Sequence, residues 1–231
     1  MKDIKILSVG GSIVAPDSVD TQFLINFKEA ILEYLDQPGS RKLVLVIGGG
    51  APARAYQRAY REITEFPDPE SQDWIGIMAT RLNAELMKGI FSDYCVEPVV
   101  TDPTYIKDFK GRILVAAGWK PGFSTDNDSV LLAKNLGADT VINLSNIKKV
   151  YSADPKLDPH AVPLDRISWT EMKKLVGDKW KPGVNVPFDP VATGYASELG
   201  LRVITAAGGD IENMKKILTG DLFDGTVIGP E

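Results

Sequence analysis

The most constraining feature of this sequence is the run KLVLVI, residues 42–47, which ends in the three glycines Gly48, Gly49 and Gly50. A nearly all-apolar run of this length is typical of a β-strand that is buried on both faces, as in parallel sheets covered by helices. The glycines that follow it predict a main-chain turn at the carboxyl end of the strand, which is where such sheets bind their ligands.

Similar apolar runs recur along the chain and alternate with amphipathic stretches. The runs predict strands at residues 4–9, 42–47, 96–100, 112–117, 140–144, 202–206 and 226–229. The amphipathic stretches predict helices at residues 21–35, 51–63, 74–91, 125–136, 169–176, 190–199 and 210–218, with a loop at 65–72. This alternation indicates a mostly parallel sheet covered on both faces, in a single α/β domain that spans residues 1–231.

Composition excludes several classes of function. The formal net charge of −5 argues against a nucleic-acid partner, whose backbone favours basic proteins. With one cysteine, Cys95, and one histidine, His160, the chain cannot form an internal disulfide or a Cys/His metal cluster, so we assign no metal ligands. We expect Cys95 to be a small buried apolar residue. No apolar run approaches the ~20 residues of a membrane span or resembles a signal peptide, which predicts a soluble, cytoplasmic protein without membrane contact.

Three glycine-rich turns follow predicted strands: VGGS at 9–12, IGGG at 47–50 and AAGWKPG at 116–122. Glycines let main-chain N–H groups approach an anion closely, and a helix that follows adds the positive end of its dipole. Three such turns at one edge of a sheet predict a phosphate-binding site. None of them matches the GxxxxGK[ST] sequence of P-loop NTPases, and GGSIVA does not fit the GxGxxG dinucleotide pattern.

Two charged residues stand beside these turns. Arg54 lies four residues after Gly50, so it can reach back toward the turn and bind phosphate, or it can belong to a solvated helix face with Arg58 and Arg61. Asp126 opens a predicted helix, where it can orient lysines or Mg²⁺ around a transferred phosphoryl group.

Five motifs occur in a set order over essentially the full chain: GGS, GGGxxxR, DxxGxxxTRxNA, PG-x-[ST]TD and NIKKVYSADPKLDP. Together they resemble the amino acid kinase superfamily, and most closely its uridylate kinases of the archaeal type. The resemblance implies a three-layer α/β/α sandwich around a largely parallel eight-stranded sheet, with an acceptor lobe at about 1–140 and an ATP lobe at about 141–231. It also implies transfer of the γ-phosphoryl group of ATP to UMP with Mg²⁺, in a homohexamer.

The resemblance also implies a role for individual residues. Asp126 organises the reaction centre, and Arg54 lies between the two phosphate groups. The residues implied to bind UMP are Gly49, Asp73, Trp119, Lys120, Pro121, Gly122, Phe123, Ser124 and Thr125. The residues implied to bind ATP are Gly10, Gly11, Ser12, Gly50, Arg54, Ser145, Asn146, Tyr151, Asp154 and Lys156.

This sequence departs from the family pattern at three places. Ser8 stands where many relatives carry a lysine in the first strand, and Lys5 would face the opposite way. Lys148 and Lys149 stand where relatives usually have Asp-Gly, and either replace that lysine electrostatically or mark a changed nucleotide preference.

Trp119 and Lys120 form the third departure, because they replace Thr followed by His or Asn. Trp119 either stacks on a base and narrows the pocket, or packs against the neighbouring helix while Lys120 is solvated. Two alternatives to a UMP kinase therefore stay open. One is a kinase of the same fold that acts on another small phosphate or carboxylate, and the other is a non-catalytic nucleotide- or oxoanion-binding relative.

Overall fold

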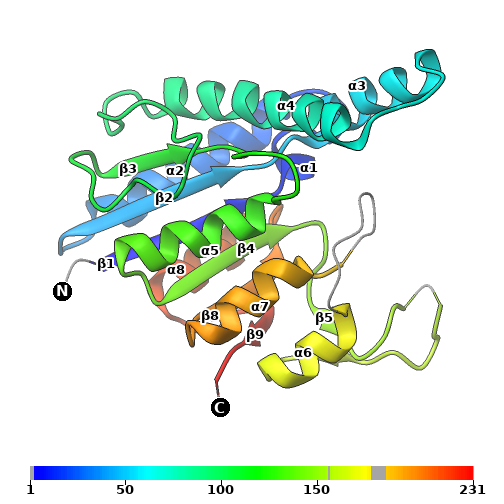
Figure 1. Ribbon diagram of the computed structural model, residues 1–231. Coiled ribbons are helices and arrows are strands. Elements are labelled where there is room, and N and C mark those ends of the chain that lie inside the picture. The colour runs from blue at the N-terminus through cyan, green and yellow to red at the C-terminus, as the bar shows by residue number, and fades with distance from the viewer. Residues whose placement is uncertain (1–2, 156, 178–185, 231) are drawn as a thin grey trace.

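The computed structural model describes residues 3–155, 157–177 and 186–230, and its centre is a seven-stranded sheet with the strand order β3-β2-β1-β4-β8-β9-β7 (Figure 1). Its strands are β1 (Asp3–Val9), β2 (Arg41–Ile47), β3 (Ile113–Ala116), β4 (Thr140–Ser145), β7 (Arg166–Ile167), β8 (Arg202–Ala207) and β9 (Thr226–Ile228). All neighbours run parallel except β8 and β9. A separate antiparallel pair is formed by β5 (Val150–Tyr151) and β6 (Pro163–Leu164).

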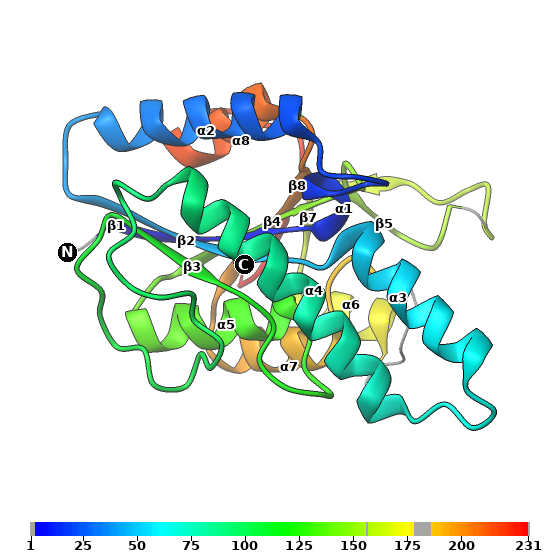
Figure 2. The ribbon, with the colours of Figure 1, turned by 90° about the horizontal axis from the view of Figure 1, so that it is seen from above.

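Helices cover both faces of this sheet, which confirms the predicted three-layer α/β/α fold. Figure 2 shows α2 (Thr21–Asp36) and α8 (Ile211–Thr219) on one side, and α5 (Thr125–Leu136) and α7 (Pro190–Glu198) on the other. α4 (Pro69–Ile90) packs with the first pair, and α6 (Trp169–Val176) packs with the second. Two further helices, α1 (Gly11–Val14) and α3 (Gly50–Ile63), begin in the glycine turns that follow β1 and β2.

The strands alternate their side chains between two cores, as the pleat requires. In β2, Leu43 and Leu45 enter the core under α2, α4 and α8, whereas Val44 and Val46 enter the core under α5, α6 and α7. All four side chains are fully buried. The run KLVLVI is therefore apolar throughout because both of its faces are covered.

Parallel register brings the glycine turns together at one edge. Val9 at the end of β1 pairs with Ile47 at the end of β2, and also with Leu144 near the end of β4. The residues that follow these three strands therefore start side by side.

One predicted strand is wrong. Residues 96–100 form a loop with a single bridge between Val100 and Ala116, and Val96 is exposed. The segment contains Pro98, which lacks an N–H, and the carboxylate of Glu97 accepts hydrogen bonds from the N–H groups of Lys110 and Gly111. Side-chain bonds to a neighbouring loop thus replace ladder bonds in this segment.

Three further differences concern short elements and the sheet. Strands β5, β6 and β7 were not predicted, because strands of two residues carry no recognisable pattern. The described residues form seven strands in the main sheet, not the eight that the resemblance implied. The predicted loop at 65–72 is half helix, because Asp68 caps α4 by accepting a hydrogen bond from Ser71 N–H at 2.7 Å, ahead of the proline at the first helical position.

Candidate active site

The first two glycine turns are in direct main-chain contact. A Cβ atom placed on Gly11 would lie 2.0 Å from the amide nitrogen of Gly50, and one placed on Gly48 would lie 2.4 Å from that of Gly11. Gly50 also has a φ of +65°, which side chains rarely adopt. Only glycines allow these two turns to interlock, so the main chains of the two turns lie against each other at the sheet edge.

Asn83 supports this surface from α4. Its side-chain amide donates hydrogen bonds to the carbonyl oxygens of Gly48 at 2.9 Å and Gly49 at 3.1 Å, and only 3% of the residue is exposed. The sequence motif contained Asn83 but gave it no role. The sequence did contain a signal for this role, because Asn83 lies three residues after Thr80 and therefore on the same face of a helix.

Arg54 joins the second turn to the first. Its guanidinium group donates to the hydroxyl of Ser12 and to the carbonyl of Pro16, both at 3.1 Å. The prediction that it reaches back from the helix agrees with this geometry. Arg54 therefore places a permanent positive charge beside the interlocked turns.

The third glycine turn, residues 118–122, is held by the same helix, α4. Thr80 accepts a hydrogen bond from Gly118 N–H at 2.8 Å, and Asp73 accepts one from Gly122 N–H at 2.9 Å. Between them, Arg81 donates to the carbonyl of Trp119 at 3.1 Å. These bonds fix the loop at both of its ends and in the middle.

A cavity of about 210 Å³ lies between α4, the second glycine turn and this loop. Five of the nine residues predicted to bind UMP line it, namely Gly49, Asp73, Phe123, Ser124 and Thr125. Trp119, Lys120, Pro121 and Gly122 belong to the adjoining loop but are not among the residues that line the cavity.

Trp119 packs against residues of its own loop. Its ring lies 4.8 Å from that of Phe123, and the ammonium group of Lys120 lies 3.9 Å from the centre of the Trp119 ring. Such a cation–π contact is favourable even near the surface. Lys120 is exposed and covers the ring instead of pointing away into solvent.

Asp126 lies in the first turn of α5, which Ser124 caps by accepting a hydrogen bond from Asn127 N–H. Its carboxylate accepts from the hydroxyl of Ser8 at 3.3 Å and from Asp189 N–H at 3.2 Å. Burial, and then the charge of Asp189, raise the pKa of Asp126 to about 6, although these hydrogen bonds oppose the shift. Asp126 thus connects β1, α5 and the start of α7.

Asp189 is a site residue that sequence reasoning missed, and it bears on the question of Mg²⁺. Its carboxylate caps α7 by accepting from Ala192 N–H at 2.8 Å, and burial raises its pKa. No group of three or more metal-binding side chains occurs in the described ranges. Mg²⁺ bound with nucleotide phosphates usually takes only one or two carboxylates, so the neighbouring pair Asp126 and Asp189 fits that ion.

Two departures from the family pattern involve lysines: the missing lysine at Ser8 and the added lysines Lys148 and Lys149. Ser8 is buried and its hydroxyl serves Asp126, while Lys5 pairs with Asp3 at the far end of β1. Lys149 forms ion pairs with Asp165 at 2.5 Å and Asp224 at 3.0 Å. Lys149 therefore anchors the segment around β5.

The predicted ATP residues lie at the neighbouring strand ends. Gly10 N–H donates to the carbonyl of Leu144 at 2.9 Å, and Gly208 N–H donates to that of Ser145 at 2.8 Å, so Ser145 adjoins the first glycine turn. Asn146, Tyr151 and Asp154 follow along the segment from β4 through β5. Lys156 lies outside the described residues.

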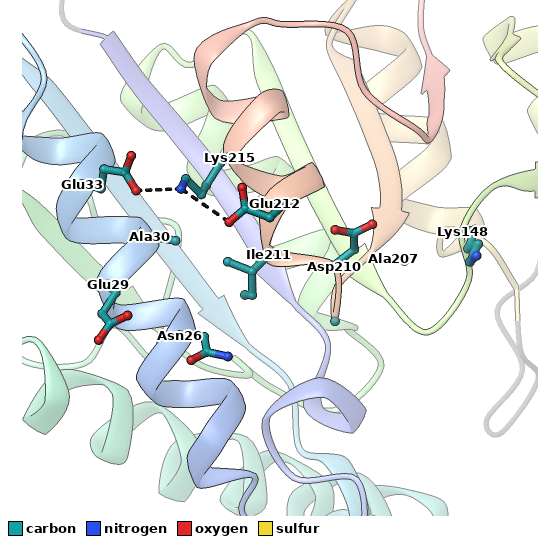
Figure 3. Close-up of a pocket in the computed structure, with 11 residues that line it drawn as sticks. Asn26, Glu29, Ala30, Glu33, Lys148, Ala207, Asp210, Ile211, Glu212 and Lys215 are labelled. Carbon is teal, nitrogen blue, oxygen red and sulfur yellow. Dashed lines mark hydrogen bonds and ion pairs between the residues drawn. The ribbon is translucent and has the colours of Figure 1, made fainter.

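A larger cavity, of about 710 Å³, lies between α2 and α8 (Figure 3). Lys148 stands at one side of it, and Lys215 in its wall is already paired with Glu33 at 2.8 Å and Glu212 at 3.5 Å. Its two lysines face four acidic residues, Glu29, Glu33, Asp210 and Glu212. This balance of charge does not suit a phosphate, so the smaller cavity is the better candidate site.

Asp128, two residues after Asp126, is fully buried, and sequence reasoning also missed it. One carboxylate oxygen accepts from Trp119 N–H at 3.2 Å, and the other has no hydrogen-bond partner within the described part of the chain. Burial, followed by the charges of Asp126 and Asp102, raises the pKa of Asp128 to about 7.

This raised pKa makes a prediction about stability. The folded protein keeps a proton on Asp128 that the unfolded chain releases, so the free energy of unfolding falls as the pH rises from about 4 to about 7. Asp128→Asn removes this loss. We expect its Tm to exceed that of the unchanged protein by about 2–4 °C or more at pH 8, equivalent to at least about 1 kcal/mol. At pH 4, where the loss has hardly begun, the two Tm values should be close, as calorimetry can measure, and an equal difference at both pH values would contradict the assignment.

Comparisons with known proteins agree with this arrangement. The profile described as "Amino acid kinase family" matches residues 3–205. The uridylate kinase of Methanocorpusculum labreanum is 34% identical over 227 residues, which cover 97% of this chain and 94% of that protein. The uridylate kinase of Methanospirillum hungatei JF-1 is also 34% identical, with 96% and 93% of the two chains covered.

Solved structures show the same relation. The crystal structure of uridylate kinase from Archaeoglobus fulgidus superposes with a TM-score of 0.81 at 33% identity, and covers 99% of this chain and all of that one. The UMP kinase from Bacillus anthracis, at 20% identity and a TM-score of 0.76 over 98% of this chain and 96% of its own, shares the fold. The chain therefore belongs to the amino acid kinase family and, within it, to the uridylate kinases of archaeal type.

Proposed function

We propose that the protein is a UMP kinase, which transfers the γ-phosphoryl group of ATP to UMP and yields UDP and ADP. The observation that carries this proposal is the contact between the glycine turns after β1 and β2. It supports the proposal because the turn assigned to the donor phosphates touches the turn assigned to the acceptor phosphate, with Arg54 bonded between them and Asp126 bonded to Ser8 in β1. The uridylate kinases named above, which resemble this chain over nearly its full length, support the choice of UMP.

The geometry suits direct in-line transfer between two bound phosphates. The enzyme then has to hold two anions in line and neutralise their charge, which needs no covalent nucleophile. It needs no general base either, because the acceptor is already a phosphate. The single histidine, His160, is therefore no obstacle to catalysis.

Each substrate has its own residues in this proposal. On the ATP side, Gly11 and Ser12 supply N–H groups beside Gly10, whose own N–H is bonded to Leu144. Gly50, Ser145, Asn146, Tyr151 and Asp154 complete the proposed ATP side. On the UMP side, Gly49 and the loop from Trp119 to Thr125 surround the cavity. Asp73 uses one carboxylate oxygen for Gly122 N–H and offers the other to the ribose hydroxyls. The division into lobes at 1–140 and 141–231 follows from the same assignment.

Mg²⁺ would be held by Asp126 and Asp189 together with the nucleotide phosphates. When bound, it neutralises the charge on the transferred group. The carboxylate of Asp126 also accepts hydrogen bonds from the Ser8 hydroxyl and the Asp189 N–H, which hold it in one orientation. Arg54 adds positive charge from the side of the glycine turns.

A coupled assay tests the proposal with ATP, Mg²⁺ and each of UMP, CMP, dUMP and AMP as acceptor. We expect turnover with UMP at a kcat/KM well above the values for the other three. No UDP at saturating substrates would contradict the proposal, and nucleotide binding without turnover would support a non-catalytic relative instead. Of the Lys148–Lys149 pair, which departs from the family pattern, Lys149 forms two ion pairs.

The proposal includes a homo-oligomer, a hexamer by resemblance, in the cytoplasm, where UDP formation belongs to pyrimidine biosynthesis. Support for association comes from four apolar side chains of α4 at a spacing of four residues, Trp74, Met78, Leu82 and Leu86, which are all exposed. A continuous apolar stripe of this kind marks a protein interface. We define these four residues as the α4 stripe. No helix among the described residues is long and apolar enough to cross a membrane.

Disrupting the α4 stripe should lower the mass of the protein in solution. Leu82 is 67% exposed, so Leu82→Glu leaves the fold intact while it places a charge in the stripe. We expect multi-angle light scattering to show a species smaller than the unchanged oligomer. Leu222→Glu is the matched control, because Leu222 is 95% exposed and lies far from α4 in the sequence. An unchanged mass for Leu82→Glu would exclude the stripe as the interface.

A further inference from the structure

Asp128 is a buried carboxylate that the transfer reaction does not use. It lies in α5, where its carboxylate accepts one hydrogen bond in the described structure, from Trp119 N–H, and its Oδ1 atom has no partner there. A buried polar oxygen without a partner costs folding free energy. Residues that lower stability in this way are commonly retained at functional sites. Asp128 therefore calls for a role in the site.

Trp119, the residue that Asp128 contacts, is fixed at three polar points. Asp128 accepts its main-chain N–H, and Arg81 donates to its carbonyl. Its indole side chain hydrogen-bonds to Asp102. Burial alone would raise the pKa of Asp102, but hydrogen bonds from Thr104 and from the indole, with the charge of Lys120, hold that pKa below its ordinary value. Asp102 is therefore charged at neutral pH and suited to anchor the indole.

Trp119 does not line the acceptor cavity, but Phe123 does, and the two rings are 4.8 Å apart with a tilt of 54°. Lys120 covers both rings, at 3.9 Å from Trp119 and 5.0 Å from Phe123. An aromatic ring at a nucleotide cavity is suited to contact the base, while the glycine turn and Asp73 are suited to contact the phosphate and the ribose of the nucleotide. The orientation of Phe123 thus depends on a tryptophan that is itself held by carboxylates.

We propose that Asp128 is a positioning residue for the acceptor nucleotide: it fixes Trp119, and through Trp119 it fixes Phe123 as the wall beside the base. This inference rests on the proposed function. It assigns Trp119 to the support of the cavity wall, and it explains why a carboxylate without a second partner is buried one helical turn behind that wall. The charged groups that face Asp128 are Asp126, which precedes it in α5, and Asp102, which lies in the loop after Val100.

Kinetics of three variants test the proposal. Asp128→Ala removes the acceptor of Trp119 N–H, whereas Asp128→Asn keeps an oxygen in its place. We expect Asp128→Ala to raise the KM for UMP about fivefold, the scale of one lost hydrogen bond, with kcat and the KM for ATP changed less than about twofold. Asp128→Asn should restore the KM for UMP. Ser129→Ala is the matched control, because Ser129 is a buried polar residue of the same turn whose hydroxyl contacts only the carbonyl of Thr125 in the described structure.

A spectroscopic measurement separates this inference from the proposed function. In the protein without nucleotide, the contribution of Trp119 to emission is obtained by comparing each variant with its Trp119→Phe derivative. We expect acrylamide to quench this contribution more strongly in Asp128→Ala than in the unchanged protein. In Asp128→Asn the quenching should equal that of the unchanged protein. Unchanged quenching in Asp128→Ala would overturn the inference. Equal changes in its KM for UMP and its KM for ATP would also overturn it. Absence of UDP formation by the unchanged protein would refute the proposed function, while the quenching still decides whether Asp128 holds Trp119.

Discussion

Replacing Asp126 with asparagine is expected to lower kcat by about 100- to 1000-fold, the range seen when one preorganised electrostatic group is removed from an active site. Asparagine has nearly the same shape and keeps one oxygen for the Ser8 hydroxyl or the Asp189 N–H. It cannot supply the negative charge that orients the cationic groups around the transferred phosphoryl. Steady-state kinetics gives kcat, and calorimetry should show a Kd for UMP within about threefold, because the loss falls on the transition state.

Ser8→Ala provides the matched comparison for Asp126. It removes the hydroxyl that Asp126 accepts but leaves the carboxylate and its contact with Asp189 N–H in place. We expect a decrease in kcat of less than about tenfold, since one neutral hydrogen bond is lost. If Asp126→Asn reduced UMP binding as strongly as it reduced kcat, Asp126 would be a binding residue and its place in the reaction centre would be wrong.

Replacing Gly11 with alanine should affect both substrates and the fold together. The new methyl group would lie 2.0 Å from the amide nitrogen of Gly50, and also within 2.6 Å of main-chain atoms of Gly48 and Gly49. Main-chain atoms cannot rotate away as a side chain can, so the two turns must separate. We expect a loss of about 3 kcal/mol in the free energy of unfolding, measured in urea, with increases in the KM for ATP and for UMP.

Gly89→Ala is the matched control for this substitution. Gly89 lies inside α4, and a Cβ atom there would meet nothing within 4 Å. Alanine is favoured over glycine inside a helix, so stability should rise by about 0.5–1 kcal/mol with unchanged kinetics. A Gly11→Ala protein as stable and active as Gly89→Ala would show that the two turns are not interlocked in solution.

The fold was largely predictable because the chain marks its elements with local signals. The helix at 125–136 was predicted with the bounds that α5 has, since Ser124 caps its start and Gly137, with a φ of +71°, ends it. α6 was equally clear between Ser168 and Gly177. The strand predicted at 96–100 was wrong because Glu97 binds a loop thirteen residues away, which no local pattern contains. Pro98 was the one local signal against a strand.

Some residues of the candidate site were likewise predictable from local motifs, and others were not. The glycine turns, Arg54 and Asp126 could be found because each belongs to a short motif. Asp189 could not, because its N–H reaches a carboxylate 63 residues earlier in the sequence through the meeting of α5 and α7. The location of Trp119 was predicted, but its orientation was not, since that is set by Asp102, Asp128 and Arg81 from three separate segments.

The contact between the first two glycine turns has a consequence for how this enzyme can change its substrates. Because the main chains of the two turns touch, a substitution in either turn would alter the geometry of the proposed donor site and of the proposed acceptor site alike. Selection acting on one nucleotide therefore cannot use these turns without disturbing the other. In the proposed assignment, adaptation to a new acceptor is left to side chains outside these two turns, such as those of Trp119 and Lys120 in the loop beside the cavity.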